Sequence, residues 1–224
     1  DEIAALLKKI GGFVLGHDMR LNTHPSQHFV LSSDKPHVVD TAVQELNFQG
    51  WLFDQMGLPQ TPYYNINVHG GKGDREDALV AGIERLNDGA RKRLTLENCE
   101  FAYTVEDLYK VYDRTGVPIV VDVHHHSINP GKLTTMAALE IGTLTWPDGV
   151  RPTTHLSNSK PEITEDDKPS KRRAHSDYIR VFQPDLLRMH QAGRVDVEVE
   201  AKGKNLAILP LMTTYSASPQ VAQK

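Results

Sequence analysis

The stretch PIVVDVHHH (residues 118–126) joins a short apolar run to four side chains that can bind metal ions. A run of β-branched residues of this length, bounded by proline and polar residues, is typical of a buried strand. The amphipathic pattern KLTTMAALEIGTL (132–144) follows it and predicts a helix. The stretch therefore predicts a strand that ends in Asp122 and the histidines, followed by a helix.

The same order, a β-rich stretch that ends in metal-binding side chains and then a helical pattern, recurs along the chain. The β-rich stretches are RLNTHP (20–25), YYNINVHGG (63–71), LTLENCE (94–100), PIVVDVHHH (118–126), RPTTHLSNS (151–159) and VDVEVEAK (195–202). The helical patterns between them cover residues 36–57, 74–86, 104–116, 132–144 and about 174–193. Alternating strands and helices predict parallel strands joined by crossover helices.

Six strands are visible, whereas a closed (β/α)8 TIM barrel has eight. The chain opens directly in a helical pattern over residues 1–18, with no strand before it. We therefore expect a single TIM-barrel-like α/β domain over residues 1–224, with about six of the eight βα units present and the N-terminal units missing. An open, doubly wound sheet is the alternative architecture.

Composition narrows the class of protein. The apolar share of 39% and the charged share of 24% are those of a globular domain, and no apolar run is long enough to cross a membrane. The formal net charge of −4 argues against a generally basic nucleic-acid binder, so any phosphate contact needs a local patch. The segment KPSKRR (168–173) is one candidate. The single cysteine, Cys99, excludes an internal disulfide and fits a reducing compartment.

Metal-binding side chains stand at the end of every predicted strand. Active sites of barrels and open α/β sheets form at the carboxyl ends of the strands, where distant residues converge. Adjacent residues cannot all point to one site, so one or two of the histidines 124–126 are expected either to contact the ligands from behind or to be exposed to solvent. Glu198 lies on the same strand face as Glu200, and one of the two is expected to be solvated. The candidate ligands are His24, His69, Glu97, Asp122, His125, His155, His175 and Glu200.

Imidazoles with a bridging carboxylate suit two or three Zn²⁺ or Mn²⁺ ions held side by side. Such clusters, with ions about 3.5–4 Å apart, cleave phosphodiester bonds. The same barrel rim also suits sugar isomerases, in which metals hold an open-chain sugar. Ligand types alone do not separate the two chemistries.

The motifs HPSQ, NVHGG, TLEN, DVHH, THLS, RAHSDY and EAK occur in this order, from about residue 3 to about residue 210. In this combination the chain resembles the UV damage endonucleases, TIM-barrel relatives of endonuclease IV. The resemblance implies nicking of double-stranded DNA 5′ of cyclobutane dimers and 6-4 photoproducts, with abasic sites as a further candidate substrate. It also implies two to three divalent ions, with Mn²⁺ favoured over Zn²⁺, Co²⁺ or Mg²⁺.

The resemblance also implies roles for the eight ligands, with Glu97, Asp122 and Glu200 as the catalytic carboxylates. By endonuclease IV-like geometry, His24, His69 and Glu97 hold one metal, and His125 with His175 helps to hold a third. The second metal is held by Glu97, Asp122, His155 and Glu200. Gln27 and His28 stand where the family has a lesion-probing pair. The expected DNA-binding residues are Lys160, Lys168, Lys171, Arg172, Arg173, Lys202 and Lys204.

Two departures from the family pattern stand out. The opening strand with its GY-type motif and the strand after it are not seen, and Thr153 occupies the position where many members have a modified lysine. The family implies an intracellular protein, in a bacterial cytoplasm rather than a fungal nucleus. Two other readings stay open, a sugar isomerase or epimerase on the same barrel and a catalytically inactive binder of damaged DNA.

Overall fold

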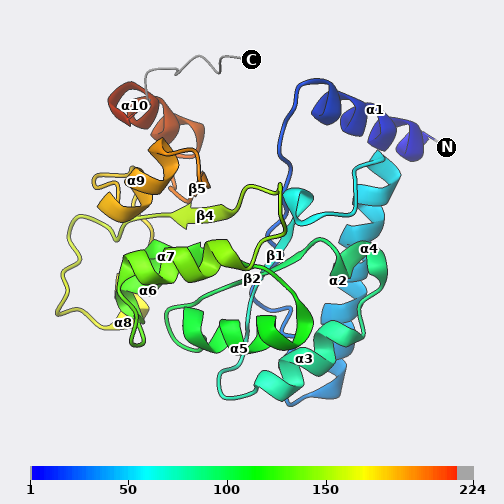
Figure 1. Cartoon of the computed structure of the whole chain (residues 1–224), viewed down its shortest axis with the longest axis horizontal. Helices are drawn as coiled ribbons and strands as arrows, with labels where there is room; N and C mark the ends of the chain where they lie inside the picture. The colour runs from blue at the N-terminus through cyan, green and yellow to red at the C-terminus, as the bar shows by residue number, and fades with distance from the viewer. Residues whose placement is uncertain (1, 216–224) are drawn as a thin grey trace.

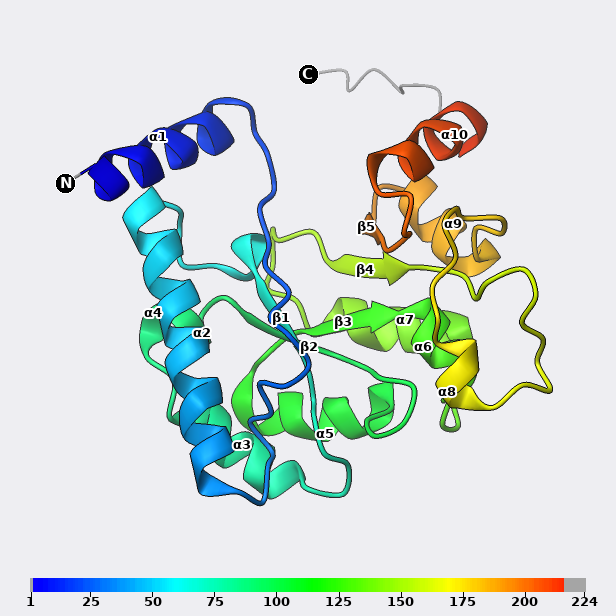
Figure 2. The same ribbon diagram turned by 180° about the vertical axis from the view of Figure 1, so that it is seen from behind.

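In the computed structural model, which describes residues 2–215, five parallel strands form one twisted sheet in the order β1-β2-β3-β4-β5 (Figures 1 and 2). The strands are β1 (Ile66–His69), β2 (Leu94–Glu97), β3 (Ile119–Asp122), β4 (Thr153–Leu156) and β5 (Asp196–Val199). Every neighbouring pair is parallel. The predicted alternation of strands and helices is therefore confirmed, and each strand lies beside the next one in sequence.

The first predicted strand, residues 20–25, is not a strand of this sheet. Thr23 forms only an isolated parallel bridge with Ile66, in which its backbone N–H donates to Asn65 and its carbonyl accepts from Asn67. Pairing stops there because Pro25 has no N–H to donate. The segment still lies along the free edge of β1, where the prediction placed it.

The helices that separate the strands begin and end at the expected signals. Thr104 and Asp107 form a capping box at the start of α5 (Val105–Thr115), and Gly116 ends it in the left-handed conformation. Pro36 opens α2 (Pro36–Met56), and Gly57 ends it in the same way. The remaining helices before β4 are α1 (Glu2–Gly16), η1 (Pro62–Tyr64), α3 (Glu76–Glu84), α4 (Asp88–Arg91), α6 (Val123–Ile128) and α7 (Thr135–Leu144), and those after it are α8 (Pro169–Arg172), α9 (Pro184–Gln191) and α10 (Asn205–Tyr215).

Two further predictions of local structure are wrong. The histidines 124–126 do not continue strand β3 but lie in α6, because the Asp122 carboxylate accepts from the N–H groups of His124 and His125 and starts a helix. The predicted helix 174–193 shrinks to α9. The backbone N–H groups of Ser176, Arg180 and Val181 donate instead to Asn158, which takes them out of any helix.

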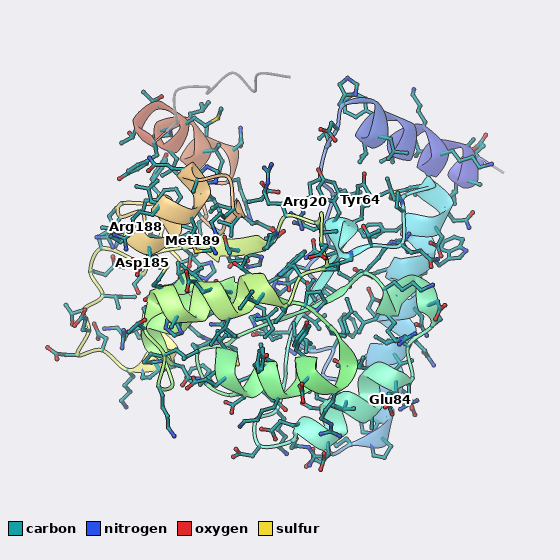
Figure 3. The ribbon with its side chains drawn as sticks, in the orientation of Figure 1. Arg20, Tyr64, Glu84, Asp185, Arg188 and Met189 are labelled. Carbon is teal, nitrogen blue, oxygen red and sulfur yellow. The ribbon has the colours of Figure 1, made fainter. Side chains whose placement is uncertain are left out.

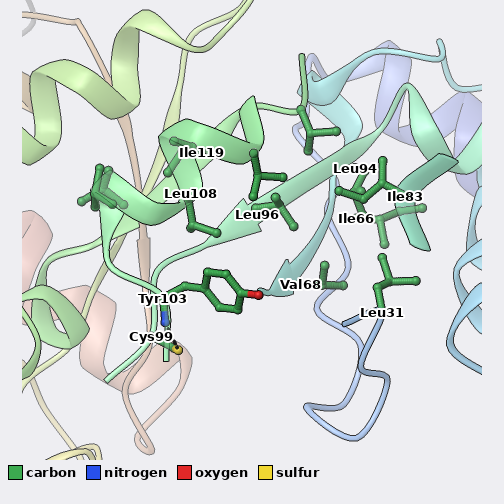
Figure 4. Close-up of a cluster of buried hydrophobic side chains, with 14 of the residues drawn as sticks. Leu31, Ile66, Val68, Ile83, Leu94, Leu96, Cys99, Tyr103, Leu108 and Ile119 are labelled. Carbon is green, nitrogen blue, oxygen red and sulfur yellow. Dashed lines mark hydrogen bonds between the residues drawn. The ribbon is translucent and has the colours of Figure 1, made fainter. Parts of the chain in front are cut away.

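The two faces of the sheet differ in polarity. Apolar residues such as Ile66, Leu96 and Ile119 face the helices and form the main hydrophobic core (Figure 4). The alternate residues of each strand face the other side, where Asn65, Thr95 and other polar groups bond to one another. We call this polar side the inner face. The described helices include none that is long and apolar enough to cross a membrane.

Side chains join the segment before Thr23 to strand β5. Arg20, labelled in Figure 3, donates to Asp196 at 3.0 Å and to the carbonyl of Arg151 at 2.7 Å. Two residues further on, Asn22 donates to Glu198 at 2.6 Å. These side-chain contacts connect the segment before Thr23, which lies beside β1 at one edge of the sheet, to β5 at the other edge. Polar side chains therefore enclose the inner face on this side.

Candidate metal centre

The strands deliver the predicted ligands to one end of the inner face. His69, Glu97 and Asp122 are the last residues of β1, β2 and β3, and their register places His69 opposite Glu97 and Asp122 opposite His155. Parallel strands all point the same way, so their carboxyl ends meet at one rim. The other ligands reach this rim from β4 (His155), from α6 (His125), and from the segments after Thr23 (His24), after β5 (Glu200) and after α8 (His175).

Three groups of side chains come close enough to hold a metal ion. Within each group the ligand atoms all lie within 4.8 Å of one another. The first group has the membership predicted from the sequence, whereas the predicted second set is divided between the other two. The groups are His24, His69 and Glu97; Glu97, Asp122 and His155; and His24, His155 and Glu200.

Glu97 lies at the middle of this cluster and is completely buried. Its carboxylate oxygens lie 3.1 Å from His24 Nε2, 3.1 Å from His125 Nδ1 and 3.3 Å from His155 Nδ1. The side-chain amide of Asn67 also donates to its Oε2, at 2.5 Å. A carboxylate shared by imidazoles on opposite sides has the position that a bridging ligand needs.

The predicted third pair is looser. The ring centroids of His125 and His175 lie 6.3 Å apart, and His175 Nδ1 is 3.8 Å from Glu200 Oε2. In the part of the chain that the structure describes, neither histidine belongs to a group of three ligands within 4.8 Å. A third metal at this pair stays a prediction.

Several buried polar atoms at the rim fit the chemistry of a metal centre. Buried groups that lack hydrogen bonds are costly, so each needs an explanation. Asp122 illustrates the arrangement: its Oδ1 caps α6, and its Oδ2 forms no hydrogen bond and lies 3.5 Å from His125 Nδ1. Within residues 2–215, the rim atoms that are buried without a hydrogen bond are His69 Nδ1, Glu97 Oε1, Asp122 Oδ2, and Nδ1 and Nε2 of His155. The donor set of imidazole and carboxylate suits Zn²⁺ or Mn²⁺.

The charges of the cluster are strongly coupled. Burial lowers the pKa of His125, but the carboxylates of Asp122 and Glu97 outweigh burial and raise that pKa to about 10. Burial also lowers the pKa of His155. The carboxylates of Glu97 and Glu198 outweigh the effect of burial, so the pKa of His155 is raised well above its ordinary value. The pKa of Glu97 is held well below its usual range, because the effect of burial is smaller than that of the surrounding imidazoles.

Metal binding is therefore expected to release protons. At pH 7 the metal-free protein holds a proton on His125, whereas an imidazole must be neutral to bind a metal. The affinity for a divalent ion should rise as the pH rises toward about 10, the pKa of His125. Calorimetric titration with Mn²⁺ in buffers of different ionisation enthalpy measures the released protons. A binding enthalpy that is the same in every buffer would contradict the prediction.

A cleft of about 1380 Å³ opens over the cluster. Of the predicted DNA-binding residues, Gln27, Arg173, Lys202 and Lys204 line it. The lining, as far as the described residues show it, does not include His28, Lys160, Lys168, Lys171 or Arg172. The predicted basic patch is thus divided, with only part of it facing the cluster.

Ion pairs reduce the charge that this patch presents. Arg173 pairs with Glu100 at 3.0 Å, and Lys171 pairs with Asp167 at 2.7 Å. Arg172 donates to the carbonyl of Ser127. All three interactions lie at least partly in solvent, where such contacts contribute little to stability. The three basic side chains could therefore leave these partners to contact a phosphate.

Sequence reasoning missed three side chains of the site. Asn67 lies two residues before His69, on the same face of β1, a spacing that could have revealed its contact with Glu97. Phe101 is 56% exposed in the cleft, with the guanidinium of Arg173 5.5 Å from its ring centre. Sequence reasoning gives Glu198 no role beyond the expectation that either it or Glu200 is solvated, but its Oε2 lies 3.4 Å from His155 Nε2. No sequence pattern distinguishes Phe101 from an ordinary loop residue.

Comparison with known proteins gives concordant results. The family model described as "UV-endonuclease UvdE" matches residues 1–223. A protein of Nostoc sp. named "UV DNA damage endonuclease" is 33% identical over 220 residues, which cover 96% of this chain and 65% of that protein. The chain thus spans about two thirds of the length of that relative.

Superposition on solved structures gives the same family and the same type of fold. A crystal structure described as SacUVDE superposes with a TM-score of 0.81 at 26% identity, over 95% of this chain and 72% of that one. A fusion protein that contains a "xylose isomerase-like TIM barrel" gives a TM-score of 0.57 at 13% identity, over 87% of this chain and 32% of that one, which bears on the fold alone. The predicted TIM-barrel type of fold is confirmed, with five of its strands formed in the described residues.

Proposed function

Because the chain belongs to the UV-endonuclease UvdE family, we propose that it is a metal-dependent DNA repair endonuclease that nicks the phosphodiester bond 5′ of UV photoproducts. Family membership over residues 1–223 is the observation that carries this proposal. The cluster around Glu97 supports it, because its three groups of ligand atoms offer neighbouring positions for divalent ions.

In this proposal, His24, His69 and Glu97 hold one ion, and Glu97, Asp122 and His155 hold a second beside it, with Glu200 completing the cluster. When bound, such ions activate a water molecule and neutralise the phosphate and the leaving oxygen. Two to three ions are proposed, with Mn²⁺ as the favoured metal. Glu97 fixes the spacing of the two positions because it belongs to both groups.

The rest of the cleft would bind the DNA. Lys202 and Lys204 lie two and four residues after Glu200 and line the cleft, so they would place positive charge near a phosphate that lies over the cluster. Phe101 presents an exposed aromatic face on which an unstacked base can lie. Cyclobutane dimers, 6-4 products and abasic sites stack poorly, so the damaged nucleotides leave the duplex at a lower cost than normal ones. A DNA substrate also implies that the protein acts inside a cell.

Gln27 is the proposed lesion probe on this side of the cleft. It lies in a turn two residues after Pro25 and is exposed. Gln27→Ala is expected to narrow the ratio of nicking rates on damaged and undamaged duplexes, with the affinity for Mn²⁺ unchanged, because the side chain touches none of the ligands. Competition between the two duplexes measures this ratio. Gln191→Ala, on α9, is the control, and an unchanged ratio in Gln27→Ala would remove Gln27 from recognition.

A nicking assay tests the function as a whole. A UV-irradiated duplex, an abasic duplex and an undamaged duplex are incubated with the chain and Mn²⁺, with each alternative metal, and with a chelator. The proposal expects a metal-dependent cut directly 5′ of the lesion. Binding of irradiated DNA without nicking in the presence of any of the metals would favour the damaged-DNA binder. Metal binding with no affinity for DNA would favour the sugar isomerase or epimerase.

A further inference from the structure

Glu198 is a carboxylate on the inner face that the metal groups do not include. It lies opposite His155 in the register of β4 and β5, and its Oε2 is 3.4 Å from His155 Nε2. The other ring nitrogen, Nδ1, faces the opposite way, 3.3 Å from Glu97 Oε2 and 3.6 Å from Glu200 Oε1. The imidazole of His155 thus separates the carboxylates of the metal cluster from a carboxylate outside it.

Asn22 fixes the position of Glu198. Its side-chain amide donates to Glu198 Oε2 at 2.6 Å, from the segment on the other side of the inner face. One layer below, the corresponding carboxylate of Asp196 is held by Arg20 and Arg151. Among residues 2–215, no lysine or arginine forms an ion pair with Glu198. The amide of Asn22 donates to it, and His155 Nε2, which has no hydrogen bond of its own there, lies 3.4 Å away.

A histidine that binds a metal through one nitrogen usually donates its other N–H to a carboxylate, which fixes the tautomer and the ring plane. His155 is buried, and the carboxylate of Glu198 is the acidic group beside its Nε2, on the side away from Glu97 and Glu200. Thr153, on the same face of β4, is also buried, but its hydroxyl is too short to act in place of a carboxylate.

We propose that Glu198, positioned by Asn22, orients His155 so that Nε2 carries the proton and Nδ1 binds the metal. This inference rests on the metal centre of the proposed function. It assigns Glu198 and Asn22 as positioning residues, since both would act through His155 and neither belongs to a group of metal-binding side chains among the described residues. It also explains why the first segment and β5 meet at this layer: their contact sets the geometry of a ligand.

The test measures metal binding, and not nicking, in the full chain. Calorimetric titration with Mn²⁺ compares the parent with Glu198→Gln and Asn22→Ala. Removing such an outer-shell partner typically weakens metal binding about 10- to 100-fold. Glu198→Gln is expected to lose affinity in that range and Asn22→Ala to lose less, because the carboxylate remains. Glu165→Gln, in the exposed loop before α8, changes the charge equally and should bind like the parent.

A spectroscopic measurement covers the case in which Glu198→Gln folds poorly. In the Zn²⁺-loaded parent, ¹H–¹⁵N correlation spectra of the histidines should show His155 protonated on Nε2, and Asn22→Ala should broaden or shift that signal. Metal on Nε2, or unchanged affinity in both variants, would overturn the inference while leaving the endonuclease proposal intact. A parent that binds no divalent ion at all would overturn both.

Discussion

Glu97→Gln is expected to abolish metal-dependent nicking and to weaken metal binding by more than the roughly 10- to 100-fold typical of outer-shell partners. Glu97 belongs to two of the three ligand groups, and it is completely buried among three imidazoles. A neutral amide keeps the shape of the side chain, but it offers one weak oxygen ligand in place of a bridging carboxylate. The substitution also removes the negative charge that attracts the neighbouring imidazoles and the metal ions.

The measurement pairs nicking rates on the irradiated duplex with the number of Mn²⁺ ions bound, determined by calorimetry. Glu84→Gln, at the exposed end of α3, is the control for the loss of a carboxylate. Melting curves show whether both variants fold. A Glu97→Gln variant that nicks as fast as the parent would mean that this cluster is not the site of the reaction.

Arg93→Met is expected to lower the free energy of unfolding by about 1–3 kcal/mol, the typical cost of leaving buried hydrogen-bond acceptors without a donor. The side chain is completely buried between the end of α4 and the start of β2. It donates to the carbonyls of Leu58, Pro59, Gly50 and Gly89 and pairs with Asp54 at 2.8 Å. Methionine fills part of the space but leaves these acceptors unpaired.

Urea unfolding of the metal-free protein, followed by circular dichroism, measures this change. Arg91→Met is the matched control, because Arg91 lies two residues earlier with a side chain that is 48% exposed. Its loss should cost less than about 1 kcal/mol, the usual limit for a surface ion pair. Equal losses in the two variants would show that the carbonyls around Arg93 find other donors.

Local signals in the sequence predicted most of the helices correctly. The capping box at Thr104, the proline at residue 36 and the glycines at 57 and 116 act through neighbouring residues alone, so no tertiary information was needed. The failures arise where distant groups compete. Asn158 takes the N–H groups that a helix after residue 174 would need, and nothing in the sequence near that segment indicates it.

The site was predicted in outline for a related reason. Parallel strands place their carboxyl ends at one rim, so the residue type at each strand end identifies the ligands. The choice of partners is a different matter. Whether Glu200 joins His24 or Asp122, and how far His175 lies from His125, depends on differences of a few ångströms in strand register and loop path.

The sequence by itself determined the strand–helix alternation, the end of the sheet at which the candidate ligands gather and the side chains available there, because hydrophobic period and strand direction are local properties. Only the tertiary structure decided that Asn22 meets Glu198, that Asn67 meets Glu97, and that Gln27 faces the cleft while His28 does not. Those contacts join residues up to 176 positions apart. Their geometry is set by packing of the whole sheet, which no local pattern encodes.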